Sequence, residues 1–430
     1  MRAATSALWG AVIFASRAFA SDAVPDASVA PRVSATPWST TFSTEARYFS
    51  WHSSFVPSAA GDGSGAPGRG WQFYAPFAAQ LTGKPAEAIS LEFIARGGWV
   101  KSVQSTPGHS GSVQTTTDTV SSGTVTYLGL PGMQPFASLS ANLPTGKAAL
   151  FGSSANARMD PDLVDISIFG EGYNIGPTAG FNFPITGSLM VTTSVGYTWR
   201  GPFNQDAPTD PTAPFLTSKV DPGDDLTATA LVNYQAGSFS AGATGTVTWE
   251  TPTSANAIRT FKAGNRYLAS LQSSYSWPAQ LGSTSLSASY VHSNRNKVLL
   301  PGFDSLVAEF FDSNSDVYRI SLQHMFPAGA FQLGPTVSAL YRNHNGYSAD
   351  TLQFVPSKTR WSTGLLAQFA PSQSATFNAR VERVWIHEGD NPAVNSEKLD
   401  ALAGGILPAA TVPAISGNGW QASIGINFKL

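Results

Sequence analysis

Apolar and polar residues alternate along most of this chain, in segments of roughly ten residues. In one of the clearest, Leu189 to Trp199, apolar side chains occupy nearly every second position and Ser, Thr and Gly occupy most of the others. Comparable segments lie at 71–81, 226–234, 239–249, 267–277, 318–326, 331–341 and 359–369. A period of two is that of a β-strand with one apolar and one polar face. The pattern therefore predicts an all-β protein.

The last segment, Asn418–Leu430, alternates in the same way. Trp420, Ile424 and Phe428 share one parity, and polar residues fill most of the other. A long strand with an unpaired edge promotes aggregation unless it finds a partner. Pairing with the first alternating segment, Thr41–Trp51, would close the sheet into a barrel.

The connections between these segments alternate in length. Short turns are predicted at 82–87, 131–134, 184–188, 236–238, 278–282, 327–330 and 371–374. Long polar connections are predicted at 52–69, 104–118, 144–165, 201–223, 251–262, 294–312, 343–356 and 389–417. In an up-and-down meander this places all long loops at one end, as in outer-membrane barrels. The count gives an antiparallel barrel of about 16 strands, or about 14 if the weakest segment, Phe136–Leu143, is not a strand.

Aromatic residues and the scarcity of charge indicate which face of the barrel is apolar. Only 12% of the 430 residues are charged, against roughly 25% in soluble domains. Aromatic side chains of the apolar parity gather near strand ends, as in the two girdles of a transmembrane barrel. The predicted girdle consists of Trp71, Tyr197, Trp199, Trp249, Trp277, Tyr341, Trp361, Trp420 and Phe428. We therefore expect a transmembrane barrel with an apolar outer face and a polar inner face.

The chain is expected to have three parts. Residues 1–20 resemble a secretory signal, with Arg2 near the start and Ala18-Phe19-Ala20 as a cleavage site. Residues 21–40 are rich in Pro, Ala and Ser and are predicted to be a periplasmic arm or plug. Residues 41–430 are predicted to form the barrel, located in the bacterial outer membrane.

Charged residues of the inward parity are the candidate lining of the lumen. They are Arg47, Glu92, Arg96, Arg200, Glu250, Arg266, Arg319, Arg342, Arg360, Arg380 and Glu382. One hypothesis is an arginine-lined passage that favours anions, as rings of basic residues do in anion pores. The other is that Arg and Glu pair across the wall, stiffening it without selecting a solute. The sequence leaves both open.

The sequence gives little reason to expect disulfides, a metal site, nucleic-acid binding or catalysis. The chain has no Cys, which excludes disulfides and thiolate metal sites, and its net charge of −2 gives no reason to expect nucleic acid as a partner. Asp160-Pro-Asp162 and Asp221–Asp225 could bind Ca²⁺, but solvated turns are the favoured interpretation. His292 and Ser293 are adjacent on a strand and point to opposite faces, so they form no catalytic pair. We expect no enzyme activity, no metal and no cofactor.

These features favour a channel through which small solutes diffuse. The expected partners are outer-membrane lipids, the barrel assembly machinery, for which Phe428 could provide the recognition signal, and a small-molecule solute. The alternative is a structural or partner-binding barrel with a closed lumen. The apolar run 401–415 in the longest connection would distinguish them, because it could narrow the mouth or present a surface to a partner.

One part of the chain resembles a known family. The motifs are Leu139–Lys147, Ala157–Asp162, Phe169–Pro177 and Val195–Gly201. They resemble outer-membrane transporters of the phenol meta-pathway type, distant relatives of the long-chain fatty-acid channels. The resemblance implies passive uptake of hydrophobic or aromatic small molecules by a monomeric barrel. It assigns no binding residue, and Leu430 stands where such barrels end in Phe.

Overall fold

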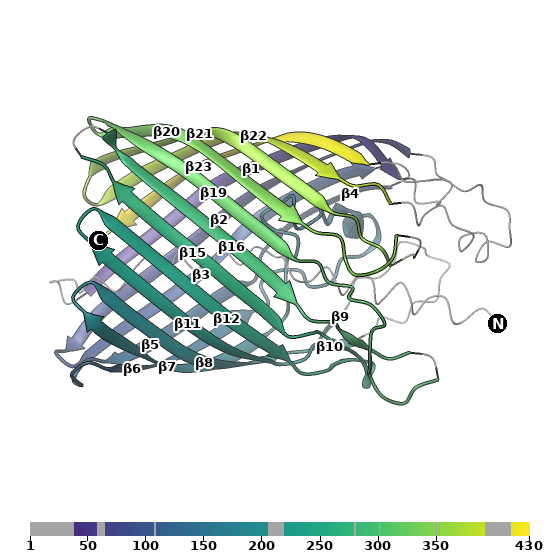
Figure 1. Cartoon of the computed structure of the whole chain (residues 1–430), viewed down its shortest axis with the longest axis horizontal. Helices are drawn as coiled ribbons and strands as arrows, with labels where there is room; N and C mark the ends of the chain where they lie inside the picture. Colours follow the sequence, from purple (N-terminus) through teal and green to yellow (C-terminus); the bar gives the residue numbers. More distant parts are fainter. Residues whose placement is uncertain are drawn as a thin grey trace.

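The computed structural model describes residues 38–57, 65–106, 109–204, 219–278, 281–300, 302–349, 351, 353–391 and 414–430. These residues form a closed antiparallel barrel of sixteen strands, which confirms the predicted fold class (Figure 1). The first strand pairs with the last, with Phe42 opposite Phe428. The predicted closure of the sheet is confirmed.

Each strand of the wall pairs with the next one along the chain. Two consecutive segments, β4 and β5, both pair with β3 and make one position in the wall, interrupted at residues 117–118. The weakest predicted strand is present as β6. The wall strands are β1 Trp38–Pro57, β2 Gly65–Ala86, β3 Ile89–Thr106, β4 His109–Thr116, β5 Thr119–Tyr127, β6 Gln134–Leu143, β7 Asn174–Thr186, β8 Leu189–Arg200, β11 Asp225–Ala236, β12 Phe239–Glu250, β15 Arg266–Ser276, β16 Ser283–Ser293, β19 Val317–Ala328, β20 Phe331–Arg342, β21 Lys358–Ser372, β22 Ala375–Glu388 and β23 Ile415–Lys429.

Tight turns gather at one end of the barrel and longer connections at the other (Figure 1). The C-terminus lies at the end with the tight turns. Four of these turns contain a glycine with positive φ, for example Gly237 at 56° and Gly329 at 68°, a backbone conformation that side chains with a Cβ rarely adopt. The predicted asymmetry of the connections is confirmed.

Parts of the long connections form a second sheet beside the mouth of the barrel. Six short strands pair in the order β18-β17-β14-β13-β10-β9. The predicted long polar loops at 201–223, 251–262 and 294–312 thus contain short strands, because backbone groups there pair within each connection and between neighbouring ones. The strands are β9 Phe203–Asn204, β10 Lys219–Asp221, β13 Thr253–Ala255, β14 Ile258–Lys262, β17 Lys297–Val298 and β18 Val307–Ala308.

Two other predicted loops are mostly strand. Within the predicted loop 52–69, β1 continues to Pro57 and β2 begins at Gly65. Within the predicted loop 104–118, β3 and β4 pair as a hairpin. Their Ser, Thr and Val residues are compatible with strands, but the polar composition of these segments led to the prediction of loops. β1 also begins at Trp38, inside the predicted arm 21–40. Residues 1–37, which include the predicted signal, lie outside the described residues, as do 401–413 of the apolar run.

The two faces of the wall differ as the alternation predicts. Side chains such as Val195, Ile320, Leu365 and Ile424 are 50–69% exposed on the outer face. Side chains of the opposite parity face the interior, where they contact one another and the connection between β6 and β7. No helix among the described residues is long and apolar enough to cross a bilayer.

Candidate functional site

The connection between β6 and β7, residues 144–173, folds into the barrel. We call this segment the inner loop. It contains the short helix η2, Gly152–Ala157, which packs on β4. Ser102 donates a hydrogen bond to the carbonyl of Ala157 at 2.8 Å, and the Gln72 amide exchanges two hydrogen bonds with the backbone of Ile166. Since Ser102 and Gln72 have inward parity, the inner loop lies on the inner wall. The prediction that this connection lies at the rim with the other long loops is wrong.

Two groups of apolar side chains fix the inner loop to the wall. The first joins it to β3 and β4 and consists of Leu150, Ala157, Phe169, Val100 and Val113. The second joins it to β1 and β22 and consists of Met159, Val164, Phe49, Val384 and Ile386. Burying one large apolar side chain contributes about 1.5–3 kcal/mol. The prediction of a polar inner face is wrong at these wall positions, because the inner loop covers them.

Acidic residues of the inner loop pair with basic residues of distant strands. The Asp162 side chain has no exposed surface; its carboxylate accepts a hydrogen bond from Arg342 at 2.8 Å and lies 4.0 Å from Arg319. Asp160 pairs with Lys358. This segment is therefore neither the solvated turn nor the Ca²⁺ site considered from the sequence. No group of three or more His, Asp or Glu in the described part of the chain is arranged to hold a metal ion.

A further contact of this kind ties the inner loop to the closing strands. Arg47 lies 3.5 Å from the Asp165 carboxylate and 2.7 Å from that of Glu45. Arg360 donates to the backbone carbonyl of Asp162 at 3.5 Å and to the Gln421 side chain at 2.9 Å. The charged contacts of the inner loop thus lie on β1 and on β19 to β21.

One carboxylate holds the base of the inner loop, which is the place where the two ends of the loop meet. Asp118, at the break between β4 and β5, accepts hydrogen bonds from the Asn142 amide at 2.8 Å, the backbone N–H of Gly146 at 2.9 Å and that of Glu171 at 2.7 Å. The two ends of the inner loop approach closely there. A Cβ on Gly146 would lie 1.9 Å from the carbonyl oxygen of Phe169. No sequence pattern pointed to this role for Asp118.

The two carboxyls that dock the inner loop on β20 and β21 differ in pKa. Burial raises the pKa of Asp162, and the neighbouring charge of Asp160 raises it further. For Asp160, burial acts in the same direction, but attraction to Lys358 and Arg342 outweighs it and lowers the pKa. A lowered pKa means that Asp160 stabilises the docked loop at pH values above its unfolded pKa of about 3.9. That stability is lost as the pH falls through the lower, folded value.

We therefore expect acid to loosen the inner loop below about pH 4. Single-channel current recorded from pH 7 down to pH 3 should become noisier in this range. In the variant Asp160→Asn, which cannot ionise at this position, the current should already be noisy at pH 7 and change little on acidification. An identical pH response in Asp160→Asn and the unmodified protein would contradict this assignment.

A cavity of about 490 Å³ lies between the inner loop and the wall formed by β1 to β3 and β23. Its lining includes Tyr74, Arg47, Arg96, Glu171 and Asn427. Arg96 is exposed to this cavity and has no ion pair with any residue that the structure describes. It is therefore a guanidinium that a passing solute could meet.

Away from the mouth, the opposite side of the interior is uncharged. We call the inward residues of β6 to β8, β11, β12, β15 and β16 the neutral wall. Hydroxyl and amide groups dominate it and bond across strands, as in Thr229 with Thr246 at 3.2 Å and Ser240 with Ser274 at 2.7 Å. Charged residues occur on these strands only at the ends near the mouth, at Arg200, Asp225, Glu250 and Arg266.

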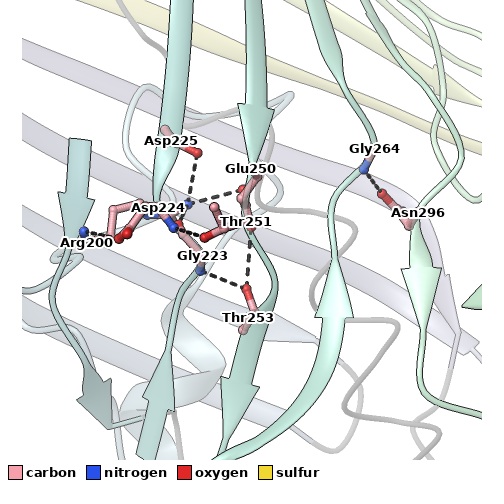
Figure 2. Close-up of polar contacts among 9 residues, drawn as sticks. All are labelled: Arg200, Gly223, Asp224, Asp225, Glu250, Thr251, Thr253, Gly264 and Asn296. Atoms are coloured by element: carbon pink, nitrogen blue, oxygen red, sulfur yellow. Dashed lines mark hydrogen bonds and ion pairs between the residues drawn. The ribbon is translucent and has the colours of Figure 1, made fainter. Parts of the chain in front are cut away.

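The charged groups at that end form a compact network (Figure 2). Arg200 lies 3.2 Å from Glu250 and 3.6 Å from Asp225, and it donates to the carbonyl of Gly223 at 3.2 Å. The N–H of Gly223 in turn donates to Thr253 at 3.2 Å. These contacts attach the second sheet to the ends of β8, β11 and β12.

The predicted lumen residues thus fall into three places. Arg47 and Arg96 border the cavity, while Arg319, Arg342 and Arg360 hold the inner loop. The others contact wall residues or stand at the mouth: Glu92 accepts from Gln80 at 2.6 Å, Arg380 bonds Glu382 at 2.6 Å, Arg200 and Glu250 belong to the mouth network, and Arg266 begins β15 opposite Thr248 and Ser293.

The predicted girdle residues stand on the outer face. Eight of them are 38–54% exposed: Tyr197, Trp199, Trp249, Trp277, Tyr341, Trp361, Trp420 and Phe428. Trp71 is partly covered by Tyr48, with ring centroids 6.2 Å apart. His292, by contrast, contacts Asp316 at 2.7 Å on the outer face.

Three groups that position the inner loop were not predicted from the sequence: Asp118, the carboxylates of the inner loop, and Lys358. A usable signal was present, because Phe49, Val100, Val384 and Ile386 are apolar at positions of the polar parity. Apolar residues facing a polar lumen require a cover. That signal indicates that something packs inside the barrel, but it does not say which segment.

Comparisons with protein-family models and with curated proteins gave no match. Among solved structures, the chain is similar to the Acinetobacter baumannii OccAB2 structure at 10% identity, over 91% of this chain and 98% of that one, with a TM-score of 0.39. It is also similar to an anion-selective porin from Comamonas acidovorans at 11% identity, over 91% and 99%, with a TM-score of 0.38.

Proposed function

We propose that this chain forms a water-filled channel in a bacterial outer membrane, through which small hydrophilic solutes diffuse. The apolar outer face with aromatic residues near both ends suits a bilayer. A barrel of sixteen strands is too wide for its own wall residues to fill. A polar interior in such a barrel holds water.

The docking of the inner loop is the observation that carries the proposal. Its buried contacts lie on β1 to β4 and on β19 to β22, which leaves the neutral wall facing it across the lumen. The passage would run between these two surfaces. A segment fixed by apolar packing and ion pairs narrows such a passage without closing it.

The lining favours polar solutes over hydrophobic ones. The buried apolar residues of inward parity on β1, β3, β4 and β22 are covered by the inner loop, so they offer no surface to a solute. Hydroxyl groups on the neutral wall would instead replace part of a solute's hydration. The aromatic substrates implied by the family resemblance therefore receive less support than small polar solutes.

Planar bilayer recordings test the proposal. Reconstituted protein should produce discrete, stable current steps in salt solution. A fully folded barrel that stays silent would overturn the channel in favour of a structural barrel with a closed lumen.

We expect ion selectivity to be weak, because most inward arginines are paired with carboxylates. Arg96 is the exposed exception beside the cavity. In a salt gradient, the reversal potential of Arg96→Gln should shift toward cations relative to the unmodified protein. Arg200→Gln, which removes the same charge at the mouth network, should shift it less. Equal shifts would contradict a particular role for Arg96.

A further inference from the structure

The outer face of five neighbouring strands carries Arg383 and Lys101, in addition to Arg69 on β2. In the order β22-β23-β1-β2-β3, Arg383 stands on the first strand and Lys101 on the last. Both point outward, because their neighbours Glu382, Val384, Val100 and Ser102 are buried on the inner side. We call this outer surface the closing face. It is where the barrel seals.

Arg383 and Lys101 each lie against a tryptophan of the outer face. The Arg383 guanidinium is 5.0 Å from the ring centroid of Trp420 and donates to the Asn418 side chain. The Lys101 ammonium is 5.7 Å from the ring centroid of Trp71. Such contacts hold a cation without neutralising it. On these five strands no Asp or Glu that the structure describes has outward parity, so both charges lack a carboxylate partner.

These positions are costly in a membrane unless an anion is present. An outward Arg or Lys costs up to about 2–4 kcal/mol at the bilayer centre and about 0–1 near its surface. Arg383 lies between the outward residues Val381 and Trp385, and Lys101 follows Trp99, so both stand at the level of the tryptophans on the long-loop side. Lipid phosphates lie at that level.

We propose that the closing face binds an anionic lipid of the outer leaflet, with Arg383 and Lys101 each contacting a phosphate. The exposed rings of Trp420 and Tyr48 and the side chain of Val381 would carry its acyl chains. Four strand spacings of about 4.8 Å separate the two cations, roughly 19 Å, so they form two phosphate contacts along one face. The inference rests on the proposed membrane location.

A second copy of the chain is a poorer occupant. In a two-fold interface the same surface meets itself. That would bring Arg383 and Lys101 of two copies together with no described carboxylate on these strands between them. Repulsion disfavours such a contact, whereas a lipid phosphate supplies the missing negative charge.

Native mass spectrometry of the full chain in a neutral detergent tests the proposal. The probe is lipid A with two phosphates, compared with the same lipid without phosphates. We expect phosphate-dependent binding, weakened about five-fold by Lys101→Gln or Arg383→Gln and about thirty-fold by the double variant. Arg96→Gln, on the inner face of the same strand as Lys101, is the matched control and should bind as the unmodified protein does.

Equal binding of both lipids, or full binding by the double variant, would overturn the proposal. So would loss of an oligomer in the double variant, because a second copy would then occupy the closing face. Resistance to SDS before heating verifies that each variant is folded. Bilayer current is measured on the same samples: a silent barrel that still binds lipid would refute the proposed channel and leave the lipid site standing.

Discussion

Replacing Arg342 with Gln is expected to release the inner loop and give larger, noisier single-channel currents. Arg342 is largely buried and pairs with the buried Asp162 carboxylate at 2.8 Å. Gln removes the positive charge, which leaves the carboxylates of Asp162 and Asp160 close together with less compensation. Breaking one partner of a buried pair costs about 3–5 kcal/mol. Here the cost falls on docking, since the apolar contacts alone would then hold that part of the loop.

Two measurements check this result. Single-channel conductance reports the width of the passage, and trypsin cleavage at Lys147, which lies on the inner loop, reports its release. Arg259→Gln makes the same change at an exposed position on β14, outside the barrel wall, and should alter neither. If Arg342→Gln and Arg259→Gln behave alike, the ion pair with Asp162 does not hold the loop.

Replacing Asp118 with Ala is expected to free the base of the inner loop. The carboxylate accepts three hydrogen bonds, from Asn142, Gly146 and Glu171. A hydrogen bond to a charged group contributes about 1.5–3 kcal/mol, and a truncation that strands several partners costs at the upper end of single-site effects, about 3–5 kcal/mol. Two backbone N–H groups lose their acceptor in the variant.

The thermal midpoint of unfolding in detergent should fall, and trypsin should cut at Lys147. Asp118→Asn is the informative companion, because its amide oxygen still accepts from one or two of the three donors and should restore part of the stability. Asp304→Ala serves as the surface control. A midpoint unchanged in Asp118→Ala would mean that the loop is held by its apolar contacts and not at its base.

Most of the wall could be predicted from the sequence because strand alternation is local. Neighbouring side chains of a strand lie on opposite faces. A segment such as 189–199 therefore shows that it is a strand, how long the strand is, and which of its side chains face outward. The weak segment at Phe136–Leu143 also follows this rule as part of β6. Prediction failed in the connections, where Ser- and Thr-rich segments such as 104–118 read as loops but pair as strands.

The candidate site was predictable only in part. Inward arginines such as Arg342 could be identified from parity, but their partners could not. Asp160 and Lys358 are separated by 198 positions, and Arg342 and Asp162 by 180. No local rule links residues so far apart, and the acidic segment looked like an ordinary turn.

The sequence by itself determined that the chain is an even-stranded barrel with an apolar outer face, closed by Asn418–Leu430 against the first strand. Those properties follow from a two-residue period and from the order of short and long connections. The tertiary structure alone decided that residues 144–173 turn inward, since that depends on apolar residues of β1, β3, β4 and β22 and cations of β19 to β21 meeting in space. It likewise placed Arg383 and Lys101 on one outer face, because only barrel closure makes β22 and β3 near neighbours.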